Sequence, residues 1–426
     1  MTDPSFPEPA EGSDERVAAY QKAVDANPGD VNAHAALAQI FEARHNLESA
    51  KQHAVSALRL EPENVVAGMT LARTLLRERQ FSDAEEAALV VTRAAGATQD
   101  SQALAWKFVG DARDRRGLTS EAFASYTRSN QIQLAQYGAL RDMNHPAHPK
   151  AVRGMAAFAA SVDVSGWRRA GFETPAPVFL MGFPRSGTTL LDQVLSSHSR
   201  IVCMEETQYL WDALSSVLRD GDTLETVEAL SVDKIDTIRR VYWREVRNAN
   251  KGAHSDAVFV DRQPLHTVLL PLIKRIFPDC KIVFALRDPR DVVLSCYQQC
   301  FAPNVTTAQF WELHRAADYY DAVMQLYDVC RERFAFDIHE VRYRDVVKNL
   351  EGEARGLARF LGVLFEEGML NYRNTALGRS INTASARQVV EPLYDSSIGR
   401  WRRYQREMEA VLPPLNGWAR RLGFEL

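Results

Sequence analysis

One stretch of the chain, from Pro177 to Glu206, constrains the fold more than any other. It reads PVFLMGFPRSGTTLLDQVLSSHSRIVCMEE and begins with a short apolar run at 178–181, which predicts a buried strand. A turn of small residues follows at 182–189, and then come apolar residues at helical spacing, namely Leu190, Leu191, Val194 and Leu195. A loop between a strand and a helix can point its backbone N–H groups at an anion, and the helix dipole favours the same negative charge. The stretch therefore predicts a phosphate-binding loop in an α/β domain.

The two glycines of this loop narrow the choice of ligand. Gly182 and Gly187 lie five residues apart, as in the GxxxxGK[ST] phosphate loop of ATP- and GTP-binding proteins. Thr188 stands where that loop has the lysine that contacts the terminal phosphates. We therefore expect a phosphate-binding loop that differs from an ordinary ATP loop. A P-loop NTPase or kinase remains an alternative, as does a strand–turn–helix without a ligand.

A second candidate anion site follows the strongest of the later apolar runs. Residues 281–286, KIVFAL, predict a strand, and RDPRDVVLS comes directly after it. Arg287 at this strand end can bind a phosphate through two N–H groups, and Ser295 on the next helix can donate a further hydrogen bond. Residues 257–260 and 338–343 predict two more strands. Because α/β proteins bind ligands at the carboxyl ends of parallel strands, these segments predict a central parallel sheet with a ligand-binding edge.

The two motifs together resemble those of sulfotransferases that use 3′-phosphoadenosine 5′-phosphosulfate (PAPS). PRSGTTLL after a strand is similar to their 5′-phosphosulfate loop, and RDPRDVVLS is similar to their 3′-phosphate motif. The resemblance implies a P-loop-like α/β sulfotransferase domain over residues 175–426. It implies transfer of the sulfuryl group of PAPS to an acceptor hydroxyl, with 3′,5′-bisphosphoadenosine (PAP) as product and no metal. The nucleotide contacts it implies are made by Arg185, Ser186, Gly187, Thr188, Thr189, Arg287, Ser295, Tyr343 and Arg400.

The acidic pair at the end of the opening stretch resembles the tyrosylprotein sulfotransferase branch in particular. This resemblance implies Glu206 as the base that accepts the proton of the acceptor hydroxyl. It implies that the transition state is stabilised by Arg185, Arg262 and Ser385. Two positions depart from the branch: Arg262 stands where the family usually has lysine, and Gln208 stands where it has an arginine that helps to bind acidic peptides. A protein or peptide tyrosine is therefore the implied acceptor. Which residues of this chain would bind the acceptor peptide is left open.

The N-terminal third has a different pattern, a repeat with a period of 34 residues. The first full unit spans 31–64, a second keeps its register, and a third is shifted by a few residues, which is typical of tetratricopeptide (TPR) repeats. Small residues let paired helices approach closely, as at Ala38, Ala50 and Ala57, so that neighbouring pairs stack into a solenoid. The sequence predicts a disordered segment at 1–13, a TPR solenoid at 14–134 and a helical linker at 135–174. A generic helical bundle is the alternative.

The combination of repeats and nucleotide motifs resembles bacterial TPR sulfotransferases, an α + α/β architecture. The resemblance implies that the curved repeat surface binds an acceptor protein or peptide, and a homodimer is left open. A repeat scaffold with an inactive sulfotransferase-like domain remains an alternative.

Composition gives no support for a nucleic-acid-binding, disulfide-linked, secreted or membrane-spanning protein. The net charge of −4 gives no indication of nucleic-acid binding. The five cysteines form no even-numbered disulfide framework, which suits a reducing compartment. The N-terminus is acidic and polar, unlike a secretory signal, and no window approaches the ~18 apolar residues of a membrane span. We therefore expect a cytoplasmic protein without a membrane span, unlike the membrane-anchored tyrosylprotein enzymes it resembles.

Overall fold

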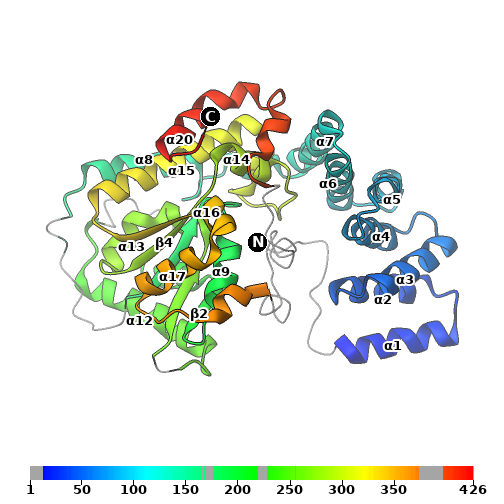
Figure 1. Cartoon of the computed structure of the whole chain (residues 1–426), viewed down its shortest axis with the longest axis horizontal. Helices are drawn as coiled ribbons and strands as arrows, with labels where there is room; N and C mark the ends of the chain where they lie inside the picture. The colour runs from blue at the N-terminus through cyan, green and yellow to red at the C-terminus, as the bar shows by residue number, and fades with distance from the viewer. Residues whose placement is uncertain are drawn as a thin grey trace.

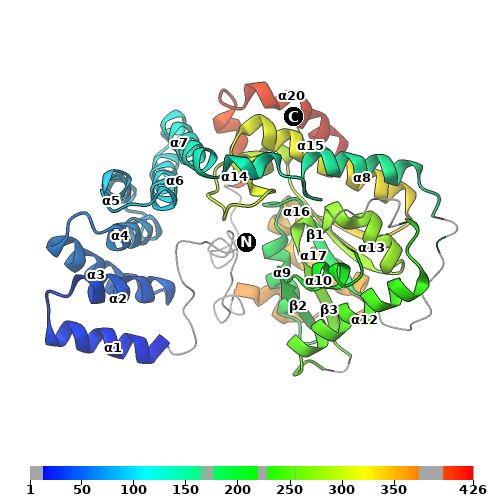
Figure 2. The same cartoon turned by 180° about the vertical axis from the view of Figure 1, so that it is seen from behind.

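The computed structural model describes residues 13–164, 167, 176–218, 228–254, 256–373 and 397–425. In these ranges the chain forms an N-terminal helical part and an α/β part, which lie side by side (Figures 1 and 2). The predicted α + α/β class is confirmed. Of the segment 1–13 that was predicted to be disordered, residues 1–12 lie outside the described residues, as does the predicted site residue Ser385, while Ser13 begins the first helix.

The helical part consists of antiparallel pairs in the predicted order. Its helices are α1 (Ser13–Ala26), α2 (Val31–Ala43), α3 (Leu47–Leu60), α4 (Val65–Arg77), α5 (Phe81–Arg93), α6 (Gln99–Arg115) and α7 (Thr119–Tyr137). The small residues Ala38, Ala50 and Ala57 are fully buried. Gly110 lies where a Cβ would come within 2.6 Å of the Tyr126 ring, so α6 and α7 can approach this closely only at a glycine. The arrangement matches stacked helix pairs, and the TPR assignment itself stays a prediction.

The α/β part is built on five parallel strands in the order β2-β3-β1-β4-β5. The strands are β1 (Val178–Gly182), β2 (Ile201–Glu205), β3 (Val258–Arg262), β4 (Lys281–Leu286) and β5 (Asp337–Arg342). The central strand β1 is buried at every position because it pairs on both sides, with β3 and with β4. The sequence predicted four of these five strands and missed β2, which forms one edge of the sheet.

Helices cover both faces of the sheet (Figure 1). They are α9 (Thr188–Ser196), α10 (Tyr209–Ser215), α12 (Val232–Ala249), α13 (Leu270–Ile276), α14 (Pro289–Tyr297), α15 (Leu313–Arg333), α16 (Tyr343–Lys348), α17 (Leu350–Leu361) and α20 (Leu412–Arg421), with short 3₁₀ turns η2 (Pro264–Leu269), η3 (Thr307–Phe310), η4 (Glu367–Asn371), η6 (Arg400–Tyr404) and η7 (Glu409–Val411). Side chains of β1 alternate between two hydrophobic clusters. Phe179 packs in a cluster with α12 and α15, whereas Leu180 packs with α9 and α17.

The segment predicted to be a linker contains α8 (Pro149–Ser161), which packs along α15. Val152 and Met155 of α8 are buried in the same cluster that covers one face of the sheet. His148 caps this helix, because its Nδ1 accepts a hydrogen bond from the backbone N–H of Lys150 at 3.2 Å. The helix is therefore part of the core of the α/β part.

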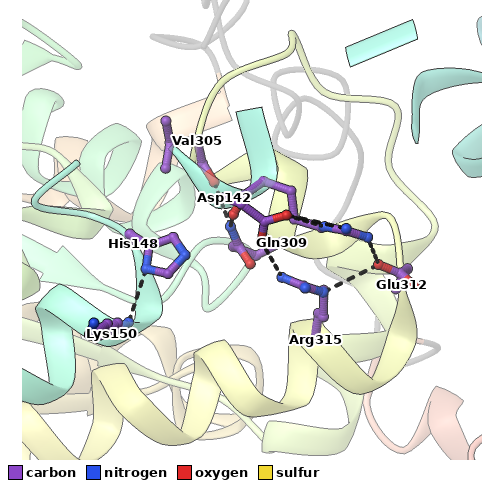
Figure 3. Close-up of polar contacts among 8 residues, drawn as sticks. Asp142, His148, Lys150, Val305, Gln309, Glu312 and Arg315 are labelled. Atoms are coloured by element: carbon purple, nitrogen blue, oxygen red, sulfur yellow. Dashed lines mark hydrogen bonds and ion pairs between the residues drawn. The ribbon is translucent and has the colours of Figure 1, made fainter. Parts of the chain in front are cut away.

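Polar contacts join the helical part to the α/β part. On α7, Asn130 Nδ2 donates to the carbonyl of Tyr297 at 2.9 Å, and Gln133 Nε2 donates to the carbonyl of Phe301 at 3.1 Å. Just beyond α7 lies η1 (Gly138–Asp142), shown in Figure 3, where Arg315 bridges Asp142 and Glu312 at 3.5 and 3.3 Å. The last helical pair is therefore fixed to the region around α14 and α15. Within the described residues, no helix combines the length and the apolar character that a membrane crossing needs.

Candidate nucleotide and transfer site

The sheet topology brings most of the predicted site residues that the structure describes to one edge. All five strands run in parallel, so their carboxyl ends lie together. Along this edge come Glu205 and Arg262, then the loop after β1, then the residues that follow β4 and β5. Glu205 and Arg262 are direct partners in the β2–β3 register. The strand ends that are predicted to bind a ligand therefore lie together, and β2 places the acidic pair among them.

The loop after β1 is tightly packed against its neighbours. A Cβ on Gly182 would lie 2.6 Å from the carbonyl oxygen of Ala285, so the loop can leave β1 beside β4 only at a glycine. Gly187 has φ +109°, and a Cβ there would also meet the Tyr343 ring at 2.9 Å. Steric constraints thus explain why both positions of the sequence motif are occupied by glycine.

The same loop presents a buried donor at the start of a helix. Ser186 is 3% exposed, and its Oγ has no hydrogen-bond partner among the described residues. Thr188 begins α9 directly afterwards. A buried hydroxyl without a partner is costly unless a ligand satisfies it. The position of this hydroxyl beside a helix N-terminus, where the dipole favours negative charge, fits a phosphate at the loop.

The two nucleotide motifs form one hydrogen-bonded cluster. Arg185 Nε donates to Ser295 Oγ at 3.0 Å, and Arg287 Nη1 donates to the carbonyl of Arg185 at 3.2 Å. The Arg287 guanidinium also lies over the Tyr343 ring, 5.0 Å from its centroid. Its Nη2 donates to the carbonyl of Ser397 at 2.7 Å. The predicted residues Arg185, Arg287, Ser295 and Tyr343 are therefore brought together, and Ser397 joins them without having been predicted.

The predicted residue Arg400 has a different partner. Its Nη2 donates to Asp114 Oδ2 at 2.9 Å, and Asp114 belongs to α6 of the helical part. The described contacts of Arg400 thus point toward the helical part, and its predicted role at the phosphates stays a prediction.

Arg262 lies among three carboxylates and is fully buried. Its Nη2 lies 2.8 Å from Glu205 Oε1, its Nη1 donates to Glu206 Oε1 at 3.2 Å, and its Nε lies 3.7 Å from Asp192 Oδ1. A buried guanidinium needs such charge partners, and the fork shape of arginine lets one side chain hold both glutamates. Glu206 itself has φ +45° and is held by a backbone hydrogen bond from its N–H to the carbonyl of Arg262 at 2.9 Å.

Asp192 is a member of this group that the sequence analysis missed. It lies one helical turn after Thr188 on α9, so the spacing from the loop was a signal that could have found it. Its Oδ2 accepts a hydrogen bond from Gln193 Nε2 at 2.8 Å. Among the residues that the structure describes, no group of three His, Cys, Asp or Glu side chains is placed to hold a metal ion.

Asp261 lies beside Arg262 on β3 but faces the core. Its Oδ2 accepts a hydrogen bond from the Tyr242 hydroxyl at 3.1 Å, and its Oδ1 lies 3.8 Å from His266 Nδ1. Burial raises the pKa of Asp261 from 3.8 to about 7, and burial lowers the pKa of His266 to about 3. Between these two values both side chains are predominantly neutral in the folded protein.

These shifts predict a pH-dependent gain in stability for Asp261→Asn. The folded protein holds the Asp261 proton up to about pH 7, while the unfolded chain loses it near pH 3.8. The contribution of Asp261 to the free energy of unfolding therefore falls as pH rises from about 4 to about 7. We expect Asp261→Asn to unfold in urea with a free energy roughly 2–4 kcal/mol higher than wild type at pH 8 and about equal at pH 4. His266 is common to both proteins and cancels in the comparison. A difference that stays constant from pH 4 to pH 8 would contradict the assignment.

A glycine-bounded loop thus links the central strand to a helix and is hydrogen-bonded to the arginine that follows the neighbouring strand β4. Residues 177–367 match the family model described as "Sulfotransferase family". This part of the chain is therefore a sulfotransferase-family domain.

Curated relatives agree with this result. An uncharacterized protein of Aquifex aeolicus is 29% identical over 255 residues, which cover 57% of this chain and 32% of that protein. Protein-tyrosine sulfotransferase 1 of Danio rerio is 27% identical over 267 residues, which cover 58% of this chain and 72% of that enzyme. Among solved structures, the sulfotransferase domain of the Synechococcus PCC 7002 olefin synthase aligns with a TM-score of 0.44 and 17% identity, covering 62% of this chain and 100% of that domain. The family and relatives support sulfotransferase activity for the α/β part.

Proposed function

We propose that this protein is a PAPS-dependent sulfotransferase that transfers a sulfuryl group to a hydroxyl, with a protein or peptide tyrosine as acceptor. The observation that carries the proposal is the cluster in which Arg287 donates to the carbonyl of Arg185, and Arg185 donates to Ser295. It joins a loop suited to a 5′-phosphate with an arginine suited to a 3′-phosphate. A nucleotide that carries both groups is the ligand this pairing supports.

The residues present suit such a nucleotide. The 5′ side would be held by the loop residues Ser186, Gly187, Thr188 and Thr189, in keeping with the partnerless Oγ of Ser186. Arg287 and Ser295 would hold the 3′-phosphate. Arg287 uses two of its five N–H donors on backbone carbonyls, and its buried Nε has no partner among the described residues. When bound, PAPS supplies an activated sulfuryl group.

The remaining catalytic roles fall to side chains of the protein. We assign Glu206 as the base that accepts the proton of the acceptor hydroxyl, because the resemblance places the family's base at this residue. Its side chain is 16% exposed and that of Glu205 is 20% exposed, so the choice between the two rests on the resemblance. Arg185 supplies positive charge beside the loop. The complete burial of Arg262 and its contacts with Glu205 and Glu206 support a role in holding the base in place. A direct contact of Arg262 with the transferred group, predicted from the sequence, has less support.

The nucleotide assignment has a simple test against the NTPase alternative. We expect PAP to raise the melting temperature of the protein and ADP at the same concentration to leave it nearly unchanged, because ADP lacks the 3′-phosphate that Arg287 would bind. Equal shifts with the two nucleotides, or a shift with ADP alone, would contradict the assignment. Measuring both at two ionic strengths separates a specific site from general attraction of anions.

Acceptor recruitment by the helical part is a further component of the proposal. The tyrosine acceptor is supported by the relatives' names, and stacked helix pairs offer a surface remote from the catalytic edge. Labelled PAPS and a cell lysate would first identify an acceptor protein. Removing residues 1–63, which takes away α1 to α3 and leaves the α7 contacts, should then lower turnover on that protein by ~10-fold or more and change turnover on its short tyrosine peptide little.

The control for this truncation is the melting shift with PAP, which should stay as in the full chain. Equal losses on protein and peptide would show that these helices only stabilise the fold. We also propose a reducing compartment such as the cytoplasm, supported by the five cysteines, which form no even-numbered disulfide framework.

A further inference from the structure

The segment from Ser397 to Tyr404, here called the C-terminal strap, joins the nucleotide cluster to the helical part. At its first residue, the carbonyl of Ser397 accepts a hydrogen bond from Arg287 Nη2 at 2.7 Å. The Ser397 hydroxyl donates to the Tyr343 hydroxyl at 3.2 Å. The strap therefore begins in contact with Arg287, which we assign to the 3′-phosphate, and with Tyr343, which is also predicted to contact the nucleotide.

The middle of the strap is held by one carboxylate of the α/β part. The backbone N–H groups of Gly399 and Trp401 donate to the two oxygens of Asp291 at 2.7 and 2.9 Å. Gly399 has φ +72°, the left-handed region that favours glycine. Asp291 lies on α14 close after Arg287, so this contact fixes the strap beside the cluster.

The far end of the strap is held by one carboxylate of the helical part. Asp114, in the last turn of α6, accepts hydrogen bonds from Arg400 Nη2 and Arg403 Nη2 at 2.9 Å each. It also accepts one from the Tyr404 hydroxyl at 2.6 Å. The Asp114 side chain is 5% exposed. Separating a nearly buried carboxylate from its three donors costs free energy, so Asp114 holds this end of the strap in place.

We propose that Asp114 is a positioning residue for the nucleotide site, acting through the strap on Arg287. The inference rests on the proposed function and deepens it. Asp114 and Asp291 together fix where Ser397 lies, and the Ser397 carbonyl holds one arm of the Arg287 guanidinium. A guanidinium held by the carbonyls of Arg185 and Ser397 is already oriented for a phosphate, so little freedom is lost on binding. The helical part would thus contribute to recognition of the 3′-phosphate.

The test compares two nucleotides by calorimetry, PAP and AMP, which lacks the 3′-phosphate. For Asp114→Asn we expect the Kd of PAP to rise about 5- to 50-fold, in the range for residues of one hydrogen-bonded network, and the Kd of AMP to stay as in wild type. Tyr404→Phe removes a single donor and should give a smaller rise of the same kind. It keeps the test valid if Asp114→Asn folds poorly.

The matched control is Glu85→Gln. Glu85 accepts hydrogen bonds from Arg113 at 2.7 Å and from Arg116, so its loss also removes two arginine contacts of the helical part, but it makes no described contact with the strap. We expect it to change neither Kd. Equal weakening of PAP and AMP by Asp114→Asn, or no change in PAP affinity with either strap variant, would overturn the inference alone. Failure of the wild-type protein to bind PAP would overturn the proposed function, and the inference with it.

Discussion

Replacing Glu206 with glutamine is expected to lower turnover by ~10²–10⁴ while the affinity for PAP stays nearly unchanged. Glutamine keeps the shape of the side chain and a carbonyl oxygen that can accept from Arg262 Nη1, now 3.2 Å from Glu206 Oε1. It cannot accept a proton from the acceptor hydroxyl. Single-turnover measurement of sulfuryl transfer, together with calorimetric titration of PAP, separates the loss of a base from a loss of binding.

Glu205→Gln is the matched control for this variant. Glu205 contacts the same guanidinium, with its Oε1 2.8 Å from Arg262 Nη2, so both variants remove one negative charge from the Arg262 group. We expect Glu205→Gln to lower turnover by ~10-fold or less, through a change in how Arg262 is held. Wild-type turnover in Glu206→Gln together with loss of turnover in Glu205→Gln would show that the other carboxylate is the base.

Replacing Arg287 with alanine is expected to weaken PAP binding by ~2–4 kcal/mol, the range for removing one partner of a buried charged pair. The side chain contacts the carbonyls of Arg185 and Ser397 and lies over Tyr343, so its loss removes both the charge and the order of the cluster. The affinity for AMP should fall much less, because AMP carries no 3′-phosphate. Calorimetry with both nucleotides gives the comparison.

Arg355→Ala provides the control for a lost arginine. Arg355 forms a half-exposed ion pair with Glu351 on α17 and makes no described contact with the nucleotide cluster. Its replacement should leave the affinity for both nucleotides unchanged. An Arg287→Ala protein that still prefers PAP over AMP as strongly as wild type would show that another residue binds the 3′-phosphate.

Much of this fold could be predicted because helices and strands follow from the spacing of apolar and small residues along the chain. The helix pairs follow from the 34-residue period and its small residues, and the apolar runs at 178–181 and 281–286 form β1 and β4. The edge strand β2 was missed because IVCME is short and its last residue already belongs to the acidic pair.

The sequence predicted which residues belong to the candidate site better than it predicted the contacts that they make. Arg185 and Arg287 belong to motifs and were found, whereas Asp114 contacts a segment far along the chain and no local pattern marks it. Arg262 was also found, but the three carboxylates around it come from α9, from the last residue of β2 and from the residue after it. Such environments depend on how strands and helices are ordered in space, and the sequence alone leaves that order open.

The strand order has a consequence for how the chain folds during synthesis. Val178 of β1 lies opposite Val260 on one side and Lys281 on the other, so the central strand cannot find its neighbours until both later segments exist. The helix pairs α2 to α7 contact mainly their sequence neighbours, and such local contacts form fast. We expect the helical part to be folded while β4 is still being made. Asn130 and Asp114 of the folded helical part would then be in place to bind α14 first and the strap later, as each is made.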